Sequence, residues 1–422
     1  MKKTLLAACA ATVVAAAHAG EGAVPTGIPA LDHVFVIMME NHAYGQVAGN
    51  PQAPFINSMM AKANTASNYF AIAHPSLTNY LEVVGGSNFN NLSDQYPNWH
   101  STSCVPAIAG ATTTDNPSTG LVCPIAGHGG HDAATPALDT SMNETSAPPL
   151  ANIDGTRSIP AGTDIVGKSI ADQLVEAGKT WKSYQEALPI AGADGVNYSD
   201  GFYVVGGVNA LGAPVTSDFA SLSTPGNPVS ASNVVALYAV KHNPFAYFKS
   251  VQDGKNPALS LRQTVSFEGQ AGLWADLKSG KVPAFAFIAP NQCNDMHGRG
   301  NGTAFCNYDA DDNGTQVGLN PALILQGDLA VQRVVTAIKA SKAWSNSKSA
   351  IVVLWDENDY STHTSNQVVA IVDTNYGPHK IVSNKYYNHY SLTKTLEAAF
   401  GLPCLNHACN DQVPVMRDLF QE

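Results

Sequence analysis

Three short runs of hydrophobic residues in this sequence each end in a group of polar side chains. The runs cover residues 34–39, 285–289 and 351–355, and each is almost continuously apolar. Strands buried on both faces of a parallel sheet have this pattern, and open α/β sheets bind ligands just beyond the carboxyl ends of their strands. We therefore expect the three ends to meet in one cleft.

The polar residues at these ends are of the types that bind divalent metal ions. In chain order they are Glu40, Asn41, Asn291, Asp295, His297, Asp356, Glu357 and Asn358. A single acidic residue after a strand means little, because turns favour Asp and Asn. Three strand ends that carry oxygen and imidazole ligands together favour a metal site.

Segments with apolar residues at helical spacing alternate with the strands. These segments cover residues 54–66, 170–178, 329–343 and 391–400. Gly178 and Gly401 are placed to end the second and the fourth. The alternation predicts an α/β fold with a mostly parallel central sheet flanked by helices.

One long stretch departs from this alternation. Residues 87–167 are rich in Gly, Thr, Ser, Asn and Pro, which predicts a long insertion over the sheet. The sequence shows no internal repeat and no interdomain linker. We therefore expect residues 20–422 to form one domain that carries the insertion.

Composition narrows the possible partners. Charged residues make up only 13% of the 422 residues, and the net charge is −11. Because the sequence has no excess of basic residues, we do not expect nucleic acid as a partner. An anionic substrate would need cations placed locally in its site. The sequence leaves the oligomeric state open.

The N-terminus has the features of a secretory signal peptide. Lys2 and Lys3 precede an apolar stretch that is too short to span a bilayer, and Ala17-His18-Ala19 is a small-x-small cleavage site. We expect cleavage after Ala19, which makes residues 1–19 a signal peptide. No other run approaches 18 apolar residues, so we expect a periplasmic or secreted bacterial protein without stable membrane insertion.

Removal of the signal peptide leaves an even number of cysteines. They are Cys104, Cys123, Cys293, Cys306, Cys404 and Cys409. In an exported chain this favours disulfides, and proximity suggests the pairs 104–123, 293–306 and 404–409 among the fifteen possible pairings. A structural zinc site is the alternative, but its usual Cys-x2-Cys modules are missing from the sequence.

One polar segment could present a hydroxyl at the start of a helix. Residues 74–80 read His-Pro-Ser-Leu-Thr-Asn-Tyr. A serine there gains from the positive end of the helix dipole, and a divalent ion beside it would lower the pKa of its hydroxyl. Ser76 is therefore a candidate nucleophile. The alternative is an ordinary N-cap serine.

Seven short motifs then follow one another in the order typical of one enzyme family. They are Glu40-Asn41-His42; His74-Pro75-Ser76-Leu77-x-Asn79-Tyr80; Trp181-Lys182-x-Tyr184; His242-Asn243-Pro244-Phe245; Pro290-Asn291-x-Cys293-Asn294-Asp295-x-His297; Trp355-Asp356-Glu357; and His389-Tyr390-Ser391-Leu392-x-x-Thr395-x-Glu397. Together they resemble the phosphoesterase family of AcpA-type acid phosphatases and bacterial phosphatidylcholine-hydrolysing phospholipases C. The resemblance runs from about His33 to Leu402 and implies an alkaline-phosphatase-like fold.

The resemblance implies a divalent metal ion, whose identity the sequence does not give. Glu40 and Asn41 would bind the ion at the end of the first strand, and Asp356 and Glu357 would complete its shell. Asp295 would be a second ligand or would orient His297. Some relatives carry Asp-Asp in place of Asp356-Glu357, so Asp356 is the firmer ligand of that pair.

The resemblance also implies a covalent mechanism. Ser76 would attack phosphorus, and the phosphoserine would then be hydrolysed, because phosphoryl transfer needs a positioned nucleophile and donors aimed at the phosphoryl oxygens. The catalytic candidates beside it are Asn79, His242, His297, His389 and His74. Thr78 stands where relatives usually carry proline.

Several other residues have simpler interpretations. Residues 309–314 resemble the start of a calcium loop, but Asn320 occupies the position of its bidentate acid, so we expect an acidic turn. Trp181 and Tyr184 could equally be core aromatics. Histidines expected to be structural or on the surface are His33, His100, His128, His131 and His407.

We therefore expect a metal-dependent hydrolase of phosphate monoesters. Phosphodiester hydrolysis of the phospholipase C type, with a phospholipid headgroup as substrate, is the alternative within the family. The chain ends about twenty residues after the last motif, so we expect none of the C-terminal β-domains of many such phospholipases. The alternative of another class is a catalytically silent protein that binds a metal or phosphate at the cell surface.

Overall fold

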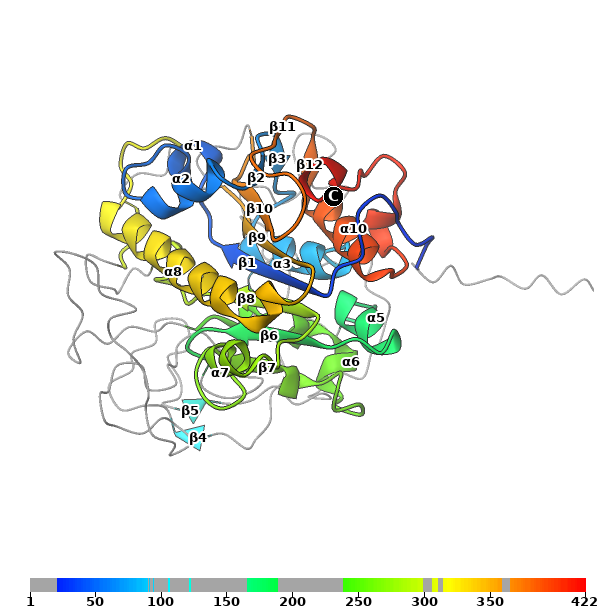
Figure 1. Cartoon of the computed structure of the whole chain (residues 1–422). Helices are drawn as coiled ribbons and strands as arrows, with labels where there is room; N and C mark the ends of the chain where they lie inside the picture. Colours follow the sequence, from blue (N-terminus) through cyan, green and yellow to red (C-terminus); the bar gives the residue numbers. More distant parts are fainter. Residues whose placement is uncertain are drawn as a thin grey trace, which may run out of the picture.

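A computed structural model describes residues 21–89, 91, 94, 105–106, 121–122, 165–188, 238–298, 306–309, 314–358 and 365–422. Its centre is an eight-stranded sheet (Figure 1). Across the sheet the strands are β11 (Val382–Ser383), β2 (Asn64–Ala66), β10 (Ala370–Thr374), β9 (Ser349–Trp355), β1 (His33–Met39), β8 (Phe285–Ala289), β6 (Trp181–Gln185) and β7 (Thr264–Ser266). Only β10 pairs antiparallel within this sheet, with β9 and β2, so the predicted mostly parallel α/β fold is confirmed.

The three apolar runs of the sequence are the three central strands. β1 lies between β9 and β8, and Val36 pairs with Val352 on one side and Phe287 on the other. Side chains 34–39 of β1 are fully buried. Since both neighbours run parallel to β1, the three strands end at the same edge of the sheet.

Helices cover both faces of the sheet (Figure 1). The helices are α1 (Tyr44–Val47), α2 (Pro54–Met60), α3 (Ser76–Gly85), α5 (Ile170–Glu176), α6 (Lys249–Gln252), α7 (Leu273–Ser279), α8 (Pro321–Ala340), α9 (Lys342–Ser345) and α10 (His389–Phe400). α3 packs on α10 and α5, whereas α8 packs on α2, α7 and α9. Because alternate strand residues face one side, Phe285 and Phe287 of β8 contact Phe400 of α10 and Tyr80 of α3.

The remaining elements are short. They are the parallel pair β3 (Tyr69–Phe70) and β12 (Tyr387–Asn388), the antiparallel pair β4 (Val105–Pro106) and β5 (Leu121–Val122), and the 3-10 turns η2 (Val240–His242), η3 (Pro244–Tyr247), η4 (Leu261–Gln263), η6 (Asn406–Cys409) and η7 (Arg417–Leu419). Trp181 and Tyr184 of β6 are buried, as core aromatics. The signal peptide, Cys104, Cys123 and most of the expected insertion lie outside the described residues.

Two predicted helices have wrong boundaries. The helix expected over 54–66 ends at Met60, because Asn64 to Ala66 pair with β10 as β2. The helix expected over 329–343 begins at Pro321, where the Asn320 side chain accepts the N–H groups of Ala322 and Leu323 as an N-cap. It ends at Ala340, and a separate short helix follows.

Two other predictions of local structure are confirmed. α10 ends at Gly401, which adopts the left-handed conformation (φ 69°) that favours glycine. The disulfides Cys293–Cys306 and Cys404–Cys409 are both present. The first disulfide ties the loop after β8 to residues 306–309, beside the carboxyl edge of the sheet.

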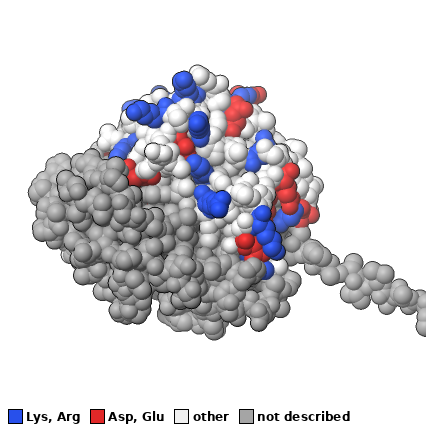
Figure 2. Space-filling model, turned by 90° about the horizontal axis from the view of Figure 1, so that it is seen from below, with Lys and Arg blue, Asp and Glu red and all other residues white. Residues whose placement is uncertain are grey.

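The described surface carries charges of both signs. On the face seen in Figure 2, Lys and Arg side chains lie among Asp and Glu side chains across the part of the surface that is described. Across the described residues, no helix has both the length and the hydrophobicity to cross a membrane.

Glu397 of α10 predicts a pH dependence of stability. Burial raises the pKa of this carboxyl well above its ordinary 4.5, and Oε1 accepts the Leu405 N–H at 2.7 Å. The folded state therefore holds the proton more tightly than the unfolded state. The stabilisation is full below about pH 4.5 and is lost as the pH rises towards the folded pKa.

Glu397→Gln should remove this dependence and raise the free energy of unfolding at pH 8 relative to the wild type. Urea unfolding at pH 5 and pH 8 measures it, with exposed Glu176→Gln as the control. Equal slopes against pH in the wild type and Glu397→Gln would contradict the assignment.

Candidate functional site

The ends of the central strands bring four carboxyl groups together. Glu40 follows β1 directly, and Asp356 and Glu357 follow β9. The Asp356 N–H donates to Met39 O at 3.0 Å, and the Glu40 N–H donates to Asp295 O at 2.9 Å, so the three chain segments leave the sheet side by side. All four carboxyl groups are fully buried.

Ser76 lies at the first position of α3, after a cis His74–Pro75 peptide bond. Asn79 holds this turn together. Its Oδ1 accepts the N–H groups of Ile72 and Ala73 at 3.1 Å, and its Nδ2 donates to Ala73 O and to Glu357 Oε2. Asn79 therefore holds the turn that carries Ser76.

The Ser76 hydroxyl points at the carboxylates. It donates to Glu40 Oε2 at 2.8 Å, and Glu357 Oε1 lies 3.5 Å away. Ser76 is buried, and Pro75 at the N-cap provides no side-chain hydrogen bond to α3. The alternative of an ordinary N-cap serine is therefore wrong, because Pro75 occupies the N-cap position.

Two of the predicted histidines contact these carboxylates. His242 lies between two of them, with Nε2 3.1 Å from Glu40 Oε1 and Nδ1 3.3 Å from Asp295 Oδ2, and its ring stacks on Tyr80. His74 Nδ1 lies 3.0 Å from Glu357 Oε2. The arrangement joins the strand ends, the start of α3 and η2 into one site.

His389 has a different environment. Its Nε2 donates to the Asp356 backbone carbonyl at 2.6 Å, and its Nδ1 lies 3.2 Å from the Tyr69 hydroxyl. Burial lowers the pKa of this imidazole to about 4. A neutral ring that holds the backbone of Asp356 suits a positioning residue.

Burial and mutual repulsion disfavour negative charge in the cluster. Burial raises the pKa of Glu40 to about 7, with Lys241 opposing the rise and Glu357 adding to it. Burial, and then the charges of Glu40 and Glu357, raise the pKa of Asp356 well above its ordinary value. Burial, reinforced by Glu40, does the same to Asp295. A cation bound beside these three carboxyl groups would favour their charged form and lower their pKa values.

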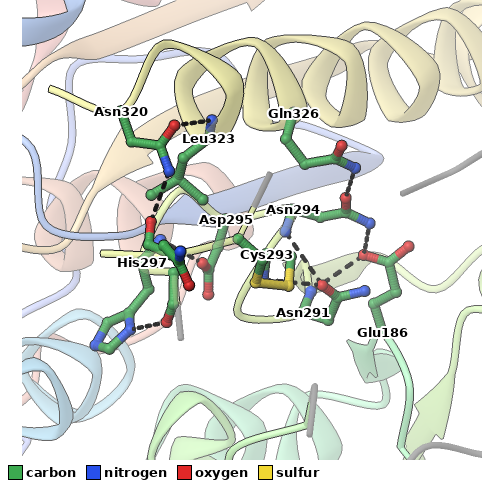
Figure 3. Close-up of a disulfide and its surroundings, with 12 residues drawn as sticks. Glu186, Asn291, Cys293, Asn294, Asp295, His297, Asn320, Leu323 and Gln326 are labelled. Atoms are coloured by element: carbon green, nitrogen blue, oxygen red, sulfur yellow. Dashed lines mark hydrogen bonds between the residues drawn. A yellow bond between two sulfur atoms is a disulfide. The ribbon is translucent and has the colours of Figure 1, made fainter. Parts of the chain in front are cut away.

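The loop after β8 is held by buried polar side chains (Figure 3). The Glu186 carboxylate accepts two hydrogen bonds from the loop, from Asn291 N at 3.1 Å and from Asn294 Nδ2 at 2.7 Å. It also accepts an N–H of Arg333 at 2.5 Å. Gln326 of α8 donates to Asn294 Oδ1 from the other side.

The same loop sets the orientation of Asp295 and His297 (Figure 3). Met296 between them has φ 82°. Its side chain packs against Gly327 of α8 so closely that a Cβ on residue 327 would lie 2.2 Å from Met296 Cγ. Asp295 Oδ1 accepts the backbone N–H of His297 at 2.7 Å, so this carboxylate orients the His297 backbone.

One further predicted site residue lies at the margin of the site. Asn41 is partly exposed beside Glu40. Its neighbour His42 lies with Nε2 2.8 Å from Asp309 Oδ2, and Asp309 Oδ1 accepts the Asn320 N–H at 2.6 Å. Asp309 therefore links two segments by hydrogen bonds, while residues 310–313 of the suspected calcium loop lie outside the described residues.

Sequence reasoning missed Lys241, the residue before His242. Its Nζ lies 3.3 Å from Ser76 Oγ, 2.9 Å from Asp94 Oδ2 and 3.2 Å from His297 Nε2. The available signal was a lysine that interrupts an apolar stretch directly before the His242 motif, in a chain with few charges.

The strand ends fit a divalent cation in donor type and charge. Both carboxylate oxygens of Asp356 are buried and make no hydrogen bond of normal geometry to the described residues. Glu40 Oε1 lies 3.1 Å from His242 Nε2, and Asp295 Oδ2 lies 3.3 Å from His242 Nδ1. Within the described ranges, no three His, Cys, Asp or Glu side chains have the spacing of a formed metal site.

Comparison with known proteins gives a consistent set of sequence relatives. The model of the phosphoesterase family matches residues 50–307. A phosphatidylinositol-3-phosphatase of Mycobacterium tuberculosis is 24% identical over 408 residues, which cover 94% of this chain and 88% of the relative. A probable acid phosphatase of Kluyveromyces lactis is 23% identical over 90% of this chain and 61% of the relative, so the chain spans only part of that protein.

Solved structures share the arrangement only distantly. A lipoteichoic acid synthase of Listeria monocytogenes gives a TM-score of 0.44 at 9% identity, covering 94% of this chain and 77% of that one. A protein in the alkaline phosphatase superfamily from Vibrio parahaemolyticus gives 0.40 at 12% identity, covering 90% and 69%.

Glu186→Ala should loosen the loop that carries Asp295 and His297. The substitution leaves the buried donors of Asn291 and Asn294 without their acceptor, so the free energy of unfolding should fall by about 2–4 kcal/mol. Glu186→Gln keeps one acceptor oxygen and should lose less. Urea denaturation measures both, with exposed Glu422→Ala as the control. A loss below about 0.5 kcal/mol for Glu186→Ala would show that the loop does not depend on this carboxylate.

Proposed function

The chain belongs to the phosphoesterase family and hydrolyses phosphoric esters, and we propose that it acts on phosphate monoesters through a phosphoserine on Ser76. One observation carries the proposal. Ser76 is buried at the start of α3, and its hydroxyl donates to Glu40 Oε2 at 2.8 Å where the central strands end. A structural serine has no need of buried carboxylates around its hydroxyl.

The reaction has two displacements. In the first, Ser76 Oγ bonds to phosphorus as the ester P–O bond breaks, and the leaving alkoxide departs with the electron pair. The serine proton leaves along its hydrogen bond to Glu40. In the second, water attacks the phosphoserine, the Oγ–P bond breaks, the Ser76 oxygen takes back the proton held by Glu40, and inorganic phosphate is released.

The histidines and Asn79 would serve the site in different ways. His242 lies between Glu40 and Asp295, within 3.1 and 3.3 Å of their carboxylates, and would help to position them. His74 would orient Glu357. His389 would hold the Asp356 backbone, and Asn79 would hold the Ser76 turn. His297 remains a candidate for direct contact with phosphate.

We propose that the carboxylates of Glu40, Asp356, Glu357 and Asp295, with the Asn41 amide, hold a divalent metal ion. The support is the burial of four acidic groups whose pKa values are raised, together with the two Asp356 carboxylate oxygens, which make no hydrogen bond of normal geometry to the described residues. Such an ion would polarise a phosphoryl oxygen and favour the ionised form of the Ser76 hydroxyl.

Monoesters are preferred over diesters because the sequence relatives named above are phosphatases. The mycobacterial relative is named for a phosphatidylinositol phosphate, so a phosphorylated lipid headgroup is among the substrates to test. Two disulfides and the N-terminal sequence support export to the periplasm or beyond.

The purified wild type should hydrolyse p-nitrophenyl phosphate faster than bis(p-nitrophenyl) phosphate. Ser76→Ala should lower kcat by at least about 10³-fold, because the nucleophile is lost. Ser58→Ala on α2 is the matched control and should leave kcat unchanged. An active Ser76→Ala enzyme would exclude Ser76 as the nucleophile, and a faster diester reaction would favour the phospholipase C alternative. No turnover of either ester by the wild type would favour the catalytically silent protein.

Metal content tests the ligand assignment without relying on turnover. The wild type should bind a divalent ion, measured by elemental analysis after dialysis, and Asp356→Asn should weaken the affinity by about 10–100-fold. Asp172→Asn, a buried acidic residue on α5, should bind metal like the wild type. Removal of the ion by a chelator should also lower the thermal unfolding temperature. Equal metal content in Asp356→Asn and the wild type would contradict the assignment.

A further inference from the structure

Lys241 occupies a buried position beside the proposed nucleophile. It lies on η2, and only 11% of its side chain is exposed. Its ammonium group can only donate hydrogen bonds, so Ser76 Oγ accepts from Lys241 at 3.3 Å while donating its own proton to Glu40. The serine oxygen is thus polarised from both sides.

The neighbours of Lys241 set the state of His297. Gly298 O, 2.8 Å from His297 Nδ1, can only accept, and Lys241 Nζ, 3.2 Å from Nε2, can only donate. His297 in this arrangement is therefore the neutral tautomer with its proton on Nδ1. Its Nε2 is an acceptor, so the positive charge beside Ser76 comes from Lys241 and not from His297.

Asp94 completes the surroundings of the ammonium group. Its Oδ2 accepts from Lys241 at 2.9 Å, and its Oδ1 accepts the Leu77 N–H at 3.0 Å, in the first turn of α3. The Asp94 carboxylate therefore joins Lys241 to the same helix start that carries Ser76. Asp94 is about one-third exposed, at 33%, so the pair reaches the surface on that side.

We propose that Lys241 is a catalytic residue, a fixed cation that stabilises the Ser76 alkoxide and binds an oxygen of the transferred phosphoryl group, and that Asp94 positions it. The proposal rests on the proposed function of Ser76. As the Oγ–P bond forms and the ester P–O bond breaks, Lys241 keeps all its protons, because its role is electrostatic. It supplies the local cation that an anionic substrate needs in this acidic chain.

The charges around Lys241 favour this fixed role over proton transfer. Burial alone would lower the pKa of Lys241, but Asp94 and Glu40 outweigh burial and raise the pKa above its usual value. A lysine with a lowered pKa would suit a general base. Lys241 instead stays charged at neutral pH.

A plain Lys–Asp ion pair is the competing explanation, and kinetics separates the two. Lys241→Met should lower kcat/KM for p-nitrophenyl phosphate by about 10²–10³-fold, as does the loss of one preorganised donor elsewhere. Lys249→Met removes a lysine that pairs with Asp253 at 3.1 Å in the next helix, and it should stay within twofold of the wild type. Lys241→Gln, which can still donate to Asp94, is a second neutral variant should Lys241→Met not fold.

Two further measurements respond to the charge itself. Inorganic phosphate, titrated by calorimetry, should bind Lys241→Met or Lys241→Gln at least about tenfold more weakly than the wild type. Ethylammonium ions added to Lys241→Ala should restore at least tenfold of the lost rate, while ethanol should restore none.

Each failure points to a different claim. Activity of Lys241→Met or Lys241→Gln within threefold of the wild type overturns the role of Lys241. A large rate loss with unchanged phosphate affinity and no rescue by ethylammonium also overturns it and leaves a structural ion pair. A wild type that hydrolyses no phosphate ester overturns the proposed function instead, and phosphate calorimetry still decides whether Lys241 binds the anion.

Discussion

Four carboxyl groups are buried at the ends of three neighbouring strands, and the cost of keeping their negative charge away from water governs the surrounding structure. Glu40, Asp295, Asp356 and Glu357 are all fully buried. Isolated charges in such a place are costly unless they are paired or bind a cation. Lys241, His242 and His74 supply part of the compensation. The divalent ion proposed above would supply the remainder.

The rest of the fold holds this cluster in place. The β1–β9 register puts Met39 beside Trp355, so Glu40 and Asp356 emerge together. Glu186 fixes the loop that carries Asp295, and the Cys293–Cys306 disulfide ties that loop to the segment that ends at Asp309. Figure 3 shows both restraints beside the loop. A site assembled from several segments needs such restraints, because small displacements weaken preorganised electrostatic contacts.

The strand ends could be predicted from the sequence because strands buried on both faces leave a near-continuous apolar pattern. Lys241 could not, because its contact with Ser76 joins segments 165 residues apart. The predicted end of the first helix was wrong for the same reason. The side chain of Asn64 donates to Pro378 O and Leu419 O, far along the chain, and its backbone joins the sheet instead of continuing α2. His389 was predicted from its motif, but only the structure shows its ring contacts with Asp356 O and Tyr69.

A covalent intermediate on Ser76 is the central claim, and acid quenching tests it most directly. The wild type is mixed with p-nitrophenyl phosphate and quenched in acid within milliseconds. The protein is then digested, and the masses of its peptides are measured by mass spectrometry. The account predicts that the peptide containing Ser76 gains the mass of one phosphoryl group, in proportion to a burst of p-nitrophenol. A burst whose phosphoryl group appears on another residue would contradict the account.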